Sequence, residues 1–233
     1  MADIAVPATD RLLHARVVII PHHVITIEAG RRAIKWERRY SPLAMISIRA
    51  ENSERNLFDG RLASITQPII FEANVACRLL LDFLDLCTAG ATPPMLRPIR
   101  QRRRTDIGIE HYRKRDGSPL EKLDLLKLSE RYGDNVLSSW ASVIAIVNKR
   151  LSHLTDDSSA RGVEADKAIA TTFAAVPDLV RQEFLEKLYS SFSPNYRVRP
   201  MEIARISGHR ALSVLALKRY THLRAEDLVG RLG

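Results

Sequence analysis

Apolar side chains recur at helical spacing through two long parts of the chain, and this pattern constrains the fold more than any other feature. Residues 66–87 carry one such apolar face, made of Val75, Ala76, Leu79, Leu80, Phe83 and Leu84. Residues 119–192 carry two more, one of Trp140, Val143, Ile144, Val147 and Leu151 and one of Val180, Phe184, Leu188 and Phe192. The spacing therefore predicts a mainly α-helical protein, and Gly90 with Pro93 and Pro94 is expected to end the first helical region.

The first 60 residues have a different pattern, which favours strands. Val17 to Ile20 and Val24 to Ile27 are β-branched runs separated by Pro21, and Leu43 to Ile48 is a third candidate strand. Between them lies a basic stretch to which no motif assigns a chemistry; it holds Arg31, Arg32, Lys35, Arg38 and Arg39, interleaved with Trp36 and Tyr40. We expect an α+β protein, mainly α-helical with a small β-sheet, in which residues 1–60 form a β-leaning segment and residues 61–233 form the main domain.

The charge of the chain is uneven. Among 233 residues, 36 are Lys or Arg and 27 are Asp or Glu, which gives a formal net charge of +9. Residues 116–186 contain 8 basic and 12 acidic residues, so the excess lies before residue 116 and after residue 196. A basic domain of this kind commonly binds a polyanion, because each neutralised phosphate releases counterions. The alternative is a basic surface with no partner.

Cysteine usage and hydropathy indicate the compartment. If residues 72–87 are helical, Cys77 and Cys87 lie on different helix faces and do not pair, which fits a reducing cytoplasm. We find no apolar run near the roughly 18 residues that cross a bilayer. Met1 to Asp10 lacks the basic start and apolar stretch of a signal peptide. The sequence therefore predicts a soluble cytoplasmic protein without a membrane partner.

The segment Met201 to Gly233 holds the most informative motifs. Ser207-Gly208-His209 fits the junction between two short helices, and Tyr220-Thr221-His222 follows eleven residues later on a strongly basic segment. This arrangement resembles the C-terminal end of the catalytic domain of tyrosine recombinases, the family of the phage integrases. The following Leu223 to Leu228 also resembles bacterial and phage integrases.

The resemblance implies site-specific DNA recombination or integration by a domain of that fold. In this family a tyrosine attacks a DNA phosphodiester and forms a 3′-phosphotyrosyl link, so Tyr220 is the expected nucleophile. His209 is then expected to donate a hydrogen bond to the phosphate, because a phenol of pKa near 10 needs cationic and hydrogen-bonding groups around the transition state. The resemblance further implies double-stranded DNA as partner, a homo-oligomer on DNA, and no metal or other cofactor.

The remaining catalytic positions of the family match less well. Arg181 is the best candidate for the second arginine of the family, although Asp178 stands where a histidine is usual. Lys114, beside the predicted turn Arg115-Asp116-Gly117, is the candidate for the hairpin lysine that protonates the leaving 5′-oxygen. The slot of the first arginine, after Thr88-Ala89-Gly90, contains no arginine. A recombinase-like protein that binds DNA without efficient cutting is therefore the alternative function.

A further group of arginines is expected to contact DNA phosphates; it comprises Arg100, Arg102, Arg103, Arg104, Arg210 and Arg219. A solvated basic face is the alternative for the first four. Within the same basic stretch, Ile107 and Ile109 alternate with polar residues like a strand. His22 and His23 do not predict a metal site, because neighbouring residues of a strand point to opposite faces.

Overall fold

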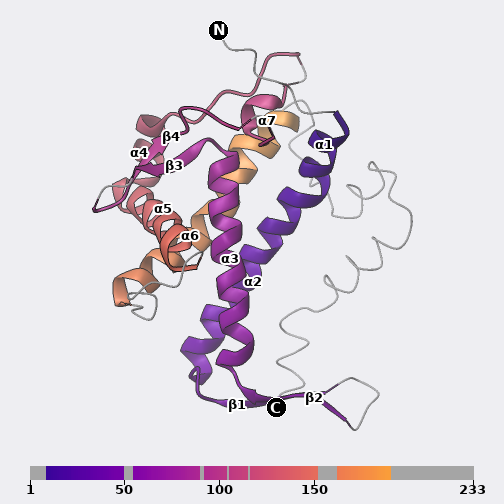
Figure 1. The fold of residues 1–233 in the computed structure, drawn as a ribbon, viewed down its shortest axis with the longest axis vertical. Coiled ribbons are helices and arrows are strands. Elements are labelled where there is room, and N and C mark those ends of the chain that lie inside the picture. Colours follow the sequence, from indigo (N-terminus) through magenta and orange to yellow (C-terminus); the bar gives the residue numbers. More distant parts are fainter. Residues whose placement is uncertain are drawn as a thin grey trace. The chain divides into compact units, whose positions relative to one another are not determined.

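The computed structural model describes residues 9–49, 55–89, 92–103, 105–114, 116–151 and 162–189, all within one compact unit, Met1–Ser190 (Figure 1). Its α-helices are α1 Thr9–His14, α2 Ile20–Tyr40, α3 Ala63–Phe83, α4 Leu125–Tyr132, α5 Asp134–Ile146, α6 Val163–Val180 and α7 Glu186–Tyr189. One-turn π-helical segments cover Ala15–Ile19, Val147–Leu151 and Arg181–Leu185, and a short 3₁₀ helix covers Ile109–His111. The strands are β1 Met45–Arg49, β2 Asn56–Arg61, β3 Leu86–Ala89 and β4 Met95–Pro98. The described part is thus mainly helical with two small antiparallel sheets, which agrees with the predicted α+β class.

Helix α3 lies at the centre of the core and contacts α2, α5 and α6. Of the apolar face predicted for residues 66–87, Ala76, Leu80, Phe83 and Leu84 are buried, whereas Leu79 is exposed; the helix ends at Phe83, before the predicted residue 87. Trp140 of α5 and Phe173 of α6 are fully buried on the same core. Large apolar side chains at helical spacing therefore supply most of the burial, which is the dominant favourable term in folding.

Helices α2 and α3 approach closely at a glycine. A Cβ atom built on Gly30 would overlap the Cβ of Ala73 and would lie 2.8 Å from a ring carbon of Phe173. Gly30 and Ala33 are both buried at this crossing. The absence of a side chain at Gly30 is therefore what lets α2 pack against α3 and α6.

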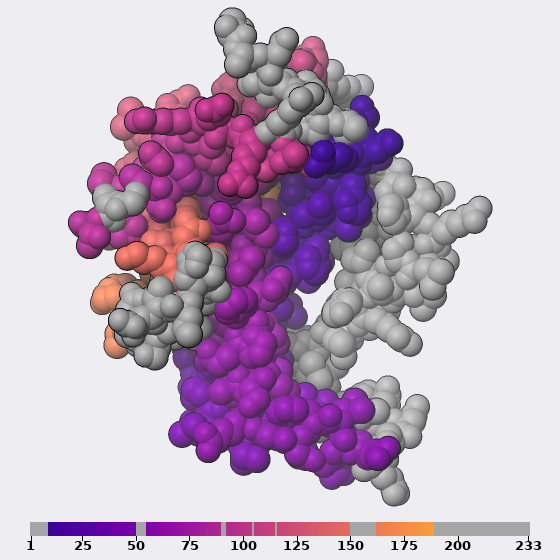
Figure 2. All heavy atoms as spheres, viewed as in Figure 1, coloured from indigo at the N-terminus to yellow at the C-terminus, as the bar shows by residue number. Residues whose placement is uncertain are grey.

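Each sheet is a two-stranded antiparallel hairpin. In the first, Met45 pairs with Arg61 and Ile48 with Phe58, so the third predicted strand, Leu43 to Ile48, is confirmed with its start shifted to Met45. In the second, β3 follows the end of α3, and Leu86 pairs with Pro98. In the space-filling view the purple atoms of the β1–β2 hairpin lie at the lower end, where Figure 1 labels the two strands (Figure 2).

The first two predicted strands are wrong, because residues 17–20 and 24–27 are helical. The Val and Ile runs favour strands by intrinsic propensity, but tertiary packing decides here: Ile20, Ile27 and Ala33 recur at helical spacing and are buried. Pro21 is tolerated because it stands at the first turn of α2, after a π-helical turn in which the Ile20 N–H bonds to the Ala15 carbonyl.

The strand-like alternation at Ile107 and Ile109 is also not realised as a strand. Ile109 instead begins the short 3₁₀ helix and is fully buried in the core. The two cysteines are free; Cys77 is buried in α3, whereas Cys87 is half-buried in β3 and not on the predicted helix. The loop and helix predictions for residues beyond 189 lie outside the described residues.

The helical stretch Thr9–Tyr40 is, by length and composition alone, long and apolar enough to cross a membrane. This finding differs from the expectation that the sequence holds no apolar run of that length. Only 17 % of the apolar window is buried, and both a core helix of a soluble protein and a signal sequence near the N-terminus satisfy the same two criteria.

Candidate functional site

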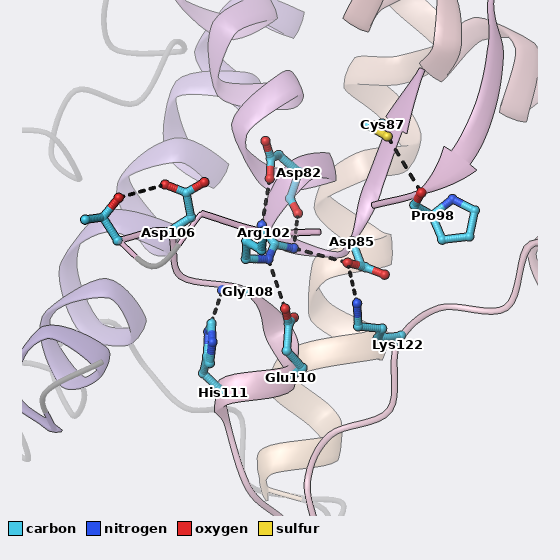
Figure 3. A network of polar contacts seen from close by, with 11 residues as sticks. Asp82, Asp85, Cys87, Pro98, Arg102, Asp106, Gly108, Glu110, His111 and Lys122 are labelled. Atoms are coloured by element: carbon cyan, nitrogen blue, oxygen red, sulfur yellow. Dashed lines mark hydrogen bonds and ion pairs between the residues drawn. The ribbon is translucent and has the colours of Figure 1, made fainter. Parts of the chain in front are cut away.

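The described unit contains one buried cluster of charged side chains, centred on Arg102 (Figure 3). Its carboxylates come from the end of α3, from the turn that follows, and from the short 3₁₀ helix. The Arg102 guanidinium donates to Asp82 Oδ1 at 2.7 Å, to the Asp82 carbonyl at 2.8 Å, and to Glu110 Oε1 at 2.9 Å. It also reaches Asp85 Oδ1 at 3.4 Å. One arginine thus joins segments far apart in sequence.

Backbone geometry places these side chains. Helix α3 ends at Phe83, and Asp85 takes a positive φ of 74°, which turns the chain from the helix into β3. Gly108 lies against the ion pair, since a Cβ there would overlap Glu110 Oε2 and lie 2.5 Å from Arg102 Nε. The Gly108 N–H also donates to His111 Nδ1 at 3.0 Å. The segment from 102 to 111 therefore folds around the guanidinium.

The charges of this cluster indicate a structural role, in which Arg102 holds three segments of the chain together. The side chain of Arg102 is 8 % exposed and that of Asp85 is 1 % exposed, while Lys122 Nζ contacts Asp85 Oδ1 at 2.9 Å. Three carboxylates face two cations, which leaves a net negative charge. Burial raises the pKa of Asp85, an effect that the hydrogen bond from Lys122 partly offsets. Such a cluster repels an anionic ligand and offers no free arginine to a phosphate.

This geometry favours a structural role for Arg102 over the predicted DNA contact. Arg100 and Arg103 are exposed, so DNA contact by these two stays a prediction. Arg104, Arg210 and Arg219 lie outside the described residues. Sequence reasoning missed the carboxylates of the Arg102 cluster; the available signal was a pair of acids three residues apart, Asp82 and Asp85, at the end of an apolar helix.

Arg181 lies in the π-helical segment that follows α6, with its side chain 51 % exposed. It pairs with two carboxylates, Asp178 at 3.3 Å and Glu186. Asp178 is the residue at the position where the family resemblance leads one to expect a histidine. The guanidinium of Arg181 is therefore accessible, but any phosphate that binds it must compete with two neighbouring carboxylates.

Lys114 lies in the tight turn that the sequence predicts. Gly117 takes a φ of +84°, the Lys114 N–H donates to the Ser118 carbonyl at 2.7 Å, and Arg113 bridges to Pro119. Hydrogen bonds from Ser118 to the Asp116 carboxylate lower the pKa of Asp116 and stabilise the turn. The Lys114 ammonium lies 3.4 Å from Glu121 Oε1. The predicted turn is confirmed, closed by a single β-bridge between Arg113 and Pro119, whereas the catalytic role of Lys114 stays a prediction.

Tyr220 and His209, the predicted nucleophile and phosphate donor, lie outside the described residues. Their position relative to Arg181 and Lys114 is therefore untested. Among the residues that the structure describes, no group of three or more His, Cys, Asp and Glu side chains could hold a metal ion. His22 and His23 lie on α2 with ring centroids 5.7 Å apart.

Part of the chain is similar to a known protein. It is 41 % identical over 76 residues, 33 % of its length, to a "Shufflon-specific DNA recombinase" from Escherichia coli. These residues cover 19 % of that protein, so the chain spans about a fifth of the length of the curated relative that it matches. No protein-family model and no solved structure matches the chain.

Proposed function

We propose that this chain acts in site-specific DNA recombination as a tyrosine-type recombinase, with a catalytic domain of that fold in residues 61–233. The observation that carries the proposal is the motif pair Ser207-Gly208-His209 and Tyr220-Thr221-His222. The similarity of 76 residues to a DNA recombinase supports the same class of reaction. DNA as substrate also accounts for the net charge of +9, and a cytoplasmic location is part of this proposal.

The proposed reaction exchanges one phosphate ester for another. The Tyr220 oxygen attacks the phosphorus, the bond from phosphorus to the 5′-oxygen breaks, and a 3′-phosphotyrosyl link forms. The phenol proton passes to water as the new bond forms, and Lys114 supplies a proton to the departing 5′-oxygen. His209 and Arg181 stabilise the charge on the non-bridging oxygens. Attack by a 5′-hydroxyl on the link reverses these steps and rejoins the strand.

A second candidate function is DNA binding with impaired catalysis, and the state of the arginines favours it. Arg181 is neutralised by Asp178 and Glu186, and Arg102 is buried in its own carboxylate cluster. A missing arginine clamp costs a few kcal/mol of transition-state stabilisation, which slows chemistry by orders of magnitude. Binding to DNA would survive that loss.

A nicked suicide substrate distinguishes the two functions. A pool of labelled duplexes with a randomised central segment carries a nick, so that the short fragment with the 5′-hydroxyl diffuses away after cleavage. The proposal predicts a protease-sensitive covalent adduct that Tyr220→Phe abolishes and His209→Ala reduces by tenfold or more. No adduct, or one that persists in Tyr220→Phe, would remove the enzymatic proposal.

Arg181 can be examined in the same assay. Asp178→His restores the residue type that the family resemblance implies and removes one carboxylate from Arg181. If Arg181 acts at the phosphate, this variant should form adduct faster than the wild type, and Arg181→Ala should abolish the gain. Identical adduct rates in Asp178→His with and without Arg181 would exclude Arg181 from the catalytic set.

A further inference from the structure

The C-terminal half of α2 carries cations that the protein does not neutralise. Of the basic residues here, Arg31 pairs with Glu28 at 3.4 Å. Arg32, Lys35, Arg38 and Arg39 are exposed and have no carboxylate partner among the residues that the structure describes. The nearby acid, Glu37, instead accepts hydrogen bonds from Thr66 and Gln67 of α3. Positive charge therefore accumulates on the solvent side of this helix.

Three of these cations form a stripe. Arg32, Lys35 and Arg39 are separated by three and four residues, so at 3.6 residues per turn they lie within about 60° of one another around the helix. At about 1.5 Å per residue the stripe is roughly 10 Å long, equivalent to about three steps of 3.4 Å along one DNA strand. We call Arg32, Lys35 and Arg39 the α2 stripe.

We infer that the α2 stripe binds the phosphodiester backbone of double-stranded DNA. Arginine and lysine side chains that lack carboxylate partners can exchange condensed counterions for phosphates, which provides affinity without reading the sequence. The Arg39 guanidinium lies over the Tyr40 ring, 5.2 Å from its centroid, and keeps its positive charge there. The stripe would then position DNA on the unit Met1–Ser190. The inference rests on the proposed function for the identity of the polyanion.

The opposite side of the same half-helix argues against a lipid surface as the partner. Helices that lie on membranes need a free apolar face beside the basic one. Here Ala33 is buried, Ile34 packs against the core, and Glu37 bonds to α3. The apolar face of this half of α2 is thus occupied within the protein, which leaves charge as the means of binding.

The test compares two full-length variants that lose the same charge. R32Q/K35Q/R39Q removes the stripe, and K127Q/K149Q/K167Q removes three exposed lysines located on α4, the π-helical segment Val147–Leu151, and α6. Binding of a fluorescent duplex of about 30 base pairs is measured by anisotropy over a series of salt concentrations. Each phosphate contact contributes about 0.9 to the slope of log K against log salt. The stripe variant should therefore reduce the slope by about 2.7, and the control by less than about 1.

Three results would overturn the inference. These are an unchanged slope in the stripe variant, an equal reduction in both variants, and stripe-dependent binding to phosphatidylserine vesicles with DNA binding intact. Melting curves followed by circular dichroism check that both variants fold. Tyr220→Phe separates this inference from the proposed function, since it should bind DNA with the wild-type slope while forming no adduct. A stripe effect without any adduct refutes only the catalysis, and an adduct without a stripe effect refutes only the inference.

Discussion

The Arg102 cluster and the α2 stripe are both rich in arginine, and they use it in opposite ways. In the cluster one guanidinium is buried and donates to three carboxylates. In the stripe three cations are exposed, and no carboxylate within the described residues pairs with them. The sequence around Arg102 contains more basic residues than the C-terminal half of α2. The stripe is nevertheless the better candidate for binding phosphates, because its cations are exposed and have no carboxylate partner among the described residues. The number of arginines in a segment is thus a poorer guide to nucleic-acid binding than the partners that the fold gives them.

The largest effect is expected from Arg102→Ala. This change leaves Glu110 and Asp82 without their cation, and removing one partner of a buried ion pair costs about 3–5 kcal/mol of unfolding free energy. Urea denaturation measures it, with Arg100→Ala as the exposed control, which should change stability by less than about 0.5 kcal/mol. Equal losses of unfolding free energy in both variants would mean that the Arg102 cluster stabilises the fold no more than an exposed arginine does.

A pH effect of about 2–3 kcal/mol is expected at Tyr112, in the segment that follows the cluster. Burial raises the pKa of Tyr112 from 10.0 to about 12, and its hydroxyl donates to the Leu12 carbonyl at 2.9 Å. The folded state therefore holds the phenol proton more tightly than the unfolded state. The associated stability is fully present below pH 10 and is lost as the pH rises through about 12, at roughly 1.4 kcal/mol per pKa unit. The measured quantity is the difference in unfolding free energy between the wild type and Tyr112→Phe, and a flat difference across this range would contradict the prediction.

A smaller loss is expected from Gly108→Ala, because the new methyl group would collide with Glu110 and Arg102. Overpacking of this kind costs about 1–3 kcal/mol. Gly162→Ala is the matched control, since a Cβ there meets nothing within 4 Å. If thermal denaturation gives the same midpoint for both variants, the Arg102 cluster can move aside and is less tightly packed than the distances indicate.

The smallest effect, and one of opposite sign, is expected for R32Q/K35Q/R39Q. Like charges three and four residues apart on a helix destabilise it by about 0.2–0.5 kcal/mol per pair, so neutralising the stripe should raise the unfolding free energy slightly. Urea denaturation at low salt shows the gain best, because salt screens the repulsion. A clear loss of stability would indicate that the contact of Arg39 with the Tyr40 ring outweighs the repulsion between the cations.

Helical periodicity predicted the existence of α3 and α5, because a long apolar face such as that of Ala76 and Leu80 must be buried against a neighbouring element. The periodic face predicted from Val180 onward begins only at the last residue of α6. Helical periodicity failed at residues 17–27, where short β-branched runs carry a strand propensity that a long helix can override. The decisive contacts there lie with α3 and α6, around Gly30, Ala73 and Phe173, and local sequence does not report them.

The sequence predicted the local turn at Gly117, but it did not predict which carboxylates contact Arg102. The turn at Gly117 follows from local chemistry, and the structure confirms it. Which carboxylates would meet Arg102 depends on the turn at Asp85 and on the packing of residues 108–111, both of which are set by tertiary structure. The pairing of Arg181 with Asp178 follows from helical spacing of three residues and was visible in the sequence.

The bare backbone at Gly30 has a consequence for how α2 meets a ligand. Gly30 packs against Ala73 of α3 and Phe173 of α6, only two residues before Arg32. The charges that follow therefore lie on a helix that is packed into the core and not on a flexible segment. Pre-organisation of this kind reduces the ordering entropy that a flexible basic tail loses on binding. A methyl group at position 30 would change the tilt of α2 against α3. It would thereby displace the charges of the α2 stripe without contacting any of them.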